Sequence, residues 1–103
     1  MNKDLYLTKA LAKILANQPA AKTFELLSQI LTDKEVDYVE RRLRIAFMLR
    51  QGHPYTKIQE ELKVSAATVA VVADQMKQPE FEDLVNRLEK EMSRFKWISG
   101  KLK

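Results

Sequence analysis

The sequence predicts an all-α protein of about six helices that includes a helix-turn-helix. Helix-breaking residues are scarce, with 2 glycines and 3 prolines in 103 residues. Apolar residues recur at spacings of three and four, as on one face of a helix, and they do not alternate as in a strand. A hydrophobic content of 46% with 31% charged residues is typical of a globular chain. We therefore expect one helical domain over residues 1–103.

The N-terminal third is expected to hold two amphipathic helices, at residues 4–17 and about 19–31. Pro19 suits the first turn of the second helix, where its missing N–H costs nothing. The apolar positions of the first helix are Leu5, Leu7, Leu11, Ile14 and Leu15, and those of the second are Phe24, Leu27, Ile30 and Leu31.

A long third helix is expected to start after Thr32 and to run to Gln51. Thr32 and Glu35 have capping-box spacing, in which the two residues satisfy each other's free amides. Gly52 is the natural stop, since glycine alone takes the left-handed cap conformation at no cost. The residues expected to face inward are Val36, Val39, Leu43, Ala46 and Phe47.

Residues 56–77 have the pattern of a helix-turn-helix, with helices at about 56–62 and 66–77 around a turn at 63–65. Thr56 and Gln59 have capping-box spacing, and Ser65 can cap the second helix. The inner face of that second helix is expected to be Val69, Val72, Ala73 and Met76. Pro79 then starts a final helix with the apolar stripe Phe81, Leu84, Val85, Leu88, Met92 and Phe95.

The net charge of +4 is confined to the C-terminal end of the chain. Over residues 1–86 the number of lysines and arginines equals the number of aspartates and glutamates. The excess comes from residues 87–103, whose bases are Arg87, Lys90, Arg94, Lys96, Lys101 and Lys103. General affinity for a polyanion would therefore depend on this tail, which we call the basic tail. The alternative is that a lysine-rich end only keeps a small protein in solution.

Catalytic and metal-binding patterns are missing from the sequence. It has no cysteine and a single histidine, His53, which precedes Pro54 and is expected to be a loop residue. The carboxylates lie on charged helix faces or at caps, with no histidine or cysteine cluster beside them. We expect no enzyme activity and no cofactor. No apolar run approaches the roughly 18 residues of a membrane-spanning helix, so we expect a cytoplasmic protein.

Residues 31–76 resemble the tryptophan repressor superfamily, and look most like its small bacterial members without an assigned corepressor. The resemblance is carried by LTDKEVDYVERRLRIAFMLRQG and by YTKIQEELKVSAATV. It implies an interlocked, all-helical homodimer that represses transcription. The partner would be duplex DNA, with the two recognition helices in successive major grooves.

The resemblance also bears on the effector. In the tryptophan-dependent members, a threonine and arginines from two helices hold the amino acid. The threonine matches Thr32 and the first arginine matches Arg42, but the second falls on Val71, which cannot pair with a carboxylate. Tryptophan is therefore not expected to bind, and any other effector is unknown. Thr32 is then interpreted as a helix cap, and Arg42 as a residue of the solvated face.

The candidate DNA-binding residues all come from the helix-turn-helix. They are Thr56, Lys57, Lys63, Ser65, Ala66, Ala67, Thr68, Ala70 and Lys77. Two features weaken DNA reading: the lysines are balanced by Glu60, Glu61 and Asp74, and the outward face carries alanines and Val71. An alternative is that this element has become a protein-interaction or dimerisation module.

Overall fold

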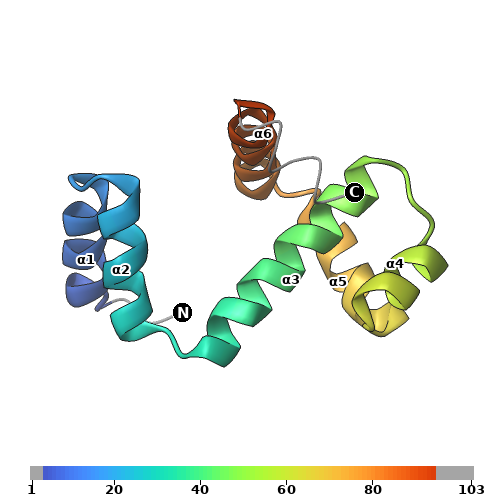
Figure 1. Cartoon of the computed structure of the whole chain (residues 1–103), viewed down its shortest axis with the longest axis horizontal. Helices are drawn as coiled ribbons and strands as arrows, with labels where there is room; N and C mark the ends of the chain where they lie inside the picture. Colours follow the sequence, from blue (N-terminus) through green and yellow to red (C-terminus); the bar gives the residue numbers. More distant parts are fainter. Residues whose placement is uncertain (1–3, 95–103) are drawn as a thin grey trace. The chain divides into compact units, whose positions relative to one another are not determined.

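The computed structural model describes residues 4–94, and these residues form six α-helices (Figure 1). The helices are α1 (Tyr6–Ala16), α2 (Ala20–Ile30), α3 (Asp33–Arg50), α4 (Tyr55–Leu62), α5 (Ala66–Gln75) and α6 (Pro79–Arg94). The predicted all-α class and the order of the elements are confirmed. Within residues 4–94, none of the helices combines the length and apolar character that a membrane crossing needs.

The chain divides into two compact units, residues 1–38 and 39–103. The first unit contains the helix pair α1–α2 and the start of α3. The hydroxyl of Thr23 in α2 donates to the carbonyl of Leu15 in α1, 3.0 Å away. Neither helix of this pair has a buried residue. The single domain that the sequence predicts over residues 1–103 stays a prediction.

The two ends of α3 follow the sequence signals. The N–H of Glu35 donates to the hydroxyl of Thr32 (3.1 Å), and the N–H of Thr32 donates to the carboxylate of Glu35 (2.8 Å). This is the predicted capping box. At the other end Gly52 has φ +84°, the left-handed conformation that glycine accepts without steric cost. His53 follows in the connection to α4, as expected of a loop residue.

Helices α4 and α5 pack against each other as a helix-turn-helix (Figure 1). Ser65 caps α5, since its hydroxyl accepts from the N–H of Thr68 at 3.1 Å. The capping role predicted for Thr56 is wrong. Helix α4 begins one residue earlier, at Tyr55, with Pro54 at the cap position and no side-chain cap. Thr56 therefore lies inside the first turn, where its hydroxyl cannot take the cap position.

The second unit has a core of aliphatic side chains and one methionine, contributed by four helices. Its buried members are Ile45, Ala46, Met48, Ile58, Val69, Val72 and Val85. The predicted inner face of α5 is confirmed, with Val69 and Val72 buried and Met76 packed against the core. For α3 the prediction is partly wrong. Val39 is 47% exposed, whereas Ile45 and Met48 are buried, because only the C-terminal half of α3 contributes to this core.

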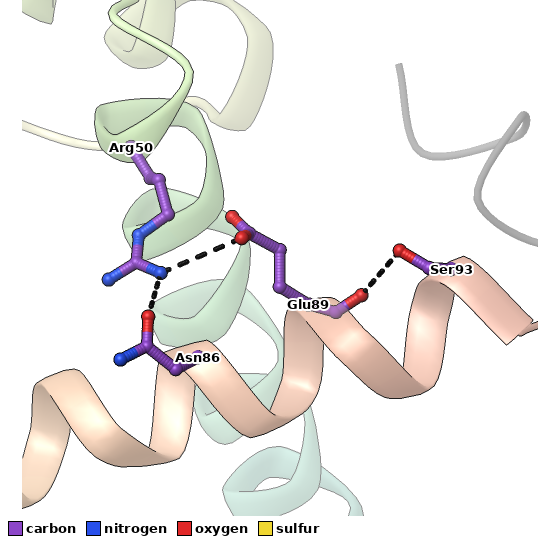
Figure 2. Close-up of polar contacts among 4 residues, drawn as sticks. All are labelled: Arg50, Asn86, Glu89 and Ser93. Carbon is purple, nitrogen blue, oxygen red and sulfur yellow. Dashed lines mark hydrogen bonds and ion pairs between the residues drawn. The ribbon is translucent and has the colours of Figure 1, made fainter.

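Helix α6 is attached to the end of α3 by a polar cluster as well as by Val85 (Figure 2). Arg50, in the last turn of α3, donates from Nη1 to the side-chain oxygen of Asn86. The same Nη1 lies 3.7 Å from Oε1 of Glu89. The Arg50 side chain is 24% exposed and that of Glu89 is 50% exposed, so the ion pair is only partly shielded from solvent and its contribution to stability is modest.

Replacement by alanine can test whether Ser65 caps its helix and Thr56 does not. We expect Ser65→Ala to lower the free energy of unfolding by about 1 kcal/mol, because a bonded N-cap is lost. Thr56→Ala, the matched control, should change it much less. Urea unfolding of both variants at one fixed protein concentration measures the difference. Equal losses at the two positions would contradict the cap assignment.

Candidate DNA-binding site

The nine candidate residues lie along α4, the turn and α5, and the side chain of every one is exposed. Thr56 and Lys57 are in the first turn of α4. Lys63 and Ser65 are in the turn, and Lys77 lies two residues past the end of α5. The set therefore belongs to one element of the second unit. Whether it contacts DNA stays a prediction.

The cations of this element are partly engaged by neighbouring acids. Nζ of Lys57 lies 3.9 Å from the carboxylate of Glu61, and Nζ of Lys77 lies 3.7 Å from that of Asp74. Such exposed pairs between residues three or four positions apart contribute little free energy, so a phosphate can replace the carboxylate. Each such replacement breaks an existing ion pair, which reduces the net free energy that the lysine gains by contacting DNA. The third lysine, Lys63, occupies the left-handed region at φ 54°.

The outward face of α5 is apolar. Ala66, Ala67 and Ala70 are exposed, and Val71 beside them is 56% exposed. Hydrogen-bonding side chains such as Arg, Asn or Gln normally read base edges. Methyl groups offer only contacts to thymine methyls, so this face has little capacity for direct base readout.

The start of α5 is better suited to a phosphate than to a base. The Ser65 hydroxyl is bonded to the N–H of Thr68 and lies 2.9 Å from the Thr68 hydroxyl. These two polar side chains are thus engaged with each other. The other first-turn amides have no partner within the helix and carry partial positive charge, the usual setting for an anion.

The basic tail is described only in part. Arg87 and Arg94 are exposed on α6 and pair with acids of the same helix, Asp83 at 2.9 Å and Glu91 at 3.3 Å. Lys90 is exposed on the same helix. The remaining cations, Lys96, Lys101 and Lys103, lie outside the described residues. The contribution of the basic tail to polyanion affinity stays a prediction.

Two residues singled out by the resemblance have definite partners. Thr32 is in the capping box described above, as interpreted from the sequence. The interpretation of Arg42 as a residue of the solvated face is wrong. Arg42 is half-buried, and its Nη1 donates to Oε1 of Gln75 in α5 at 2.7 Å. Gln75 was not singled out from the sequence. The available signal was that Arg42 stands four residues before Ala46, which the sequence already predicted to face inward.

Over residues 4–94 the chain therefore has six helices, two of which form an exposed helix-turn-helix. The chain belongs to the Trp repressor protein family, whose model matches residues 6–89. This is a family of DNA-binding regulators and not of enzymes. No match to the chain is found among curated proteins or among solved structures.

The side chain at position 71 and the hydrogen bond of Arg42 lead to a prediction about tryptophan. We expect no tryptophan binding at micromolar concentration. Val71 offers no charge to a carboxylate, and Arg42 already donates to Gln75. A hydrogen bond to a charged group contributes about 1.5–3 kcal/mol, so the missing arginine alone should weaken binding at least roughly tenfold. Isothermal titration calorimetry checks this, and a micromolar dissociation constant would show that another residue has taken over the role.

Proposed function

We propose that this protein is a DNA-binding transcriptional regulator, repressor-like, that does not respond to tryptophan. The observation that carries the proposal is the exposed, Ser65-capped α5 of a helix-turn-helix, within a chain of the Trp repressor protein family. Such a regulator would act in the cytoplasm on duplex DNA.

The mode of binding follows from the charges and the apolar face. Lys57, Lys63 and Lys77 and the start of α5 would contact phosphates, which supply affinity but carry no base sequence. Alanine methyls would lie where other regulators place hydrogen-bonding side chains. Binding should therefore be strongly salt-dependent and weakly selective, with the remaining selectivity coming from DNA shape and bridging water.

The working form would be a homodimer. Helices α1 and α2 bury no residue, while Leu7 is 88% and Phe24 61% exposed. Apolar side chains this exposed on a two-helix unit favour burial against another chain. We propose that a second copy covers them, and that the chain acts as one domain in that dimer.

A second candidate function is a protein-interaction module. It is favoured by Val71, which is 56% exposed beside three exposed alanines on a face that in a solvent-facing helix would be charged. A partner protein that covered this face would bury apolar surface and gain free energy in proportion to its area. Under this alternative the helix-turn-helix no longer reads DNA.

A salt titration of binding to random-sequence duplex DNA tests the proposed function. We expect the logarithm of affinity to fall steeply with the logarithm of salt concentration. The double variant Lys57→Gln/Lys63→Gln should weaken binding to all duplexes alike and reduce the slope by roughly two per chain. The matched control Lys9→Gln/Lys13→Gln removes the same charge from α1 and should leave the slope unchanged. Absence of binding even at low salt would favour the interaction module.

Replacing Val71 with arginine separates the two candidates. If the outward face of α5 enters a DNA groove, Val71→Arg should tighten binding several-fold, because one more cation reaches the phosphates. Sedimentation should show a dimer for both the wild type and the variant. If the face is covered by protein, the variant should instead lose the dimer or the partner complex, because an arginine would be desolvated without a counter-charge. A monomeric wild type would refute the proposed dimer.

A further inference from the structure

The recognition helix α5 has a polar link to α3 outside the helix-turn-helix. Gln75 is the last residue of α5, and its side-chain oxygen accepts from Nη1 of Arg42 in α3. The two residues are 33 positions apart, the bond is 2.7 Å long, and it is partly buried. Both residues belong to the second unit. The link thus joins the far end of α5 to α3, which supplies three of the buried core residues, Ile45, Ala46 and Met48.

This bond supplies a constraint that the apolar core of the unit does not. Val69 and Val72 are buried at 0% and 1% exposure and determine which face of α5 points inward, but apolar contacts are non-directional and fix no polar partner at the end of the helix. A hydrogen bond from a guanidinium is directional and stronger than a neutral one. The Ser65 cap is a bond within the first turn of α5, whereas the Arg42–Gln75 bond ties the end of α5 to another helix.

The same bond limits what a small molecule can do at this position. A carboxylate ligand that needed Nη1 of Arg42 would have to displace the Gln75 amide, losing the bond that holds the end of α5. An anionic effector would therefore compete with the positioning of the recognition helix instead of creating it.

We propose that the Arg42–Gln75 bond is a built-in brace that holds α5 in its DNA-binding orientation, so that DNA affinity needs no small-molecule effector. This inference rests on the proposed function and specifies the regulation of that site. Arg42 and Gln75 are positioning residues, since they act through the orientation of the outward face of α5 and not through contact with DNA.

The first test compares Gln75→Ala with Gln78→Ala, the same truncation at an exposed position beyond α5. Hydrogen exchange of the α5 amides, measured on the protein alone, should become several-fold faster in Gln75→Ala and stay unchanged in Gln78→Ala. Gln75→Glu keeps an acceptor for Arg42 and should restore slow exchange. Unchanged exchange in Gln75→Ala would overturn the brace.

The second test measures affinity for a pool of random-sequence duplexes. The protein is first unfolded in denaturant, dialysed and refolded to remove any small molecule. The wild type should bind with the same affinity before and after this treatment, and a loss of affinity would overturn effector independence. Gln75→Ala should bind about fivefold more weakly, as expected from one lost hydrogen bond.

A double-mutant cycle shows whether the two residues act through their bond. Arg42→Ala should weaken DNA binding, whereas Arg41→Ala, at the exposed neighbouring position, should weaken it less. The double variant Arg42→Ala/Gln75→Ala should bind no more weakly than Arg42→Ala. Additive losses would show that the residues act independently and would overturn the brace.

Comparing hydrogen exchange in α5 with DNA binding of the wild type also separates failure of the inference from failure of the proposed function. If the wild type binds no DNA while Gln75→Ala still accelerates exchange in α5, the proposed function is wrong and the brace is only structural. If the wild type binds DNA and exchange in α5 does not respond, the proposed function stands and the inference falls.

Discussion

Burial of a few apolar side chains in the second unit is the constraint on which the helix-turn-helix depends. Helices α4 and α5 have 8 and 10 residues, too short to be stable alone in water. Each is anchored by a fully buried side chain, Ile58 in α4 and Val69 in α5. Their partners on α3 are Ile45, Ala46 and Met48. The long helix is therefore the support on which the helix-turn-helix is assembled.

The two faces of α5 differ in how strongly the fold constrains their residues. The inner face is determined by packing, since Val69 and Val72 leave almost no surface to solvent. The outer face has no comparable constraint from the fold, yet it carries small apolar residues where charged ones would be neutral for stability. The arrangement of the helices and the family of the chain therefore support the proposed DNA binding more than the side chains of this face do.

Local signals predicted most of the fold, and long-range contacts account for the rest. Helix boundaries are marked by bonds or backbone conformations that involve only a few neighbouring residues, as at Thr32, Gly52, Ser65 and Pro79. The local sequence was therefore sufficient to predict them. Thr56 failed because Pro54 allows α4 to start one residue earlier. For the candidate site, the nine residues and the apolar outer face could be identified from spacing, but the bond between Arg42 and Gln75 could not. It depends on how α3 and α5 cross, which no local pattern encodes.

The turn before α5 carries a conformational cost. Lys63 is the one non-glycine residue with positive φ within residues 4–94, and a left-handed conformation costs a residue with a Cβ atom roughly 1–2 kcal/mol. Glycine would remove that strain and with it the ammonium group. Under the proposed function, stability and affinity therefore make opposite demands on this position, and the chain accepts a less stable turn to keep a positive charge beside its recognition helix.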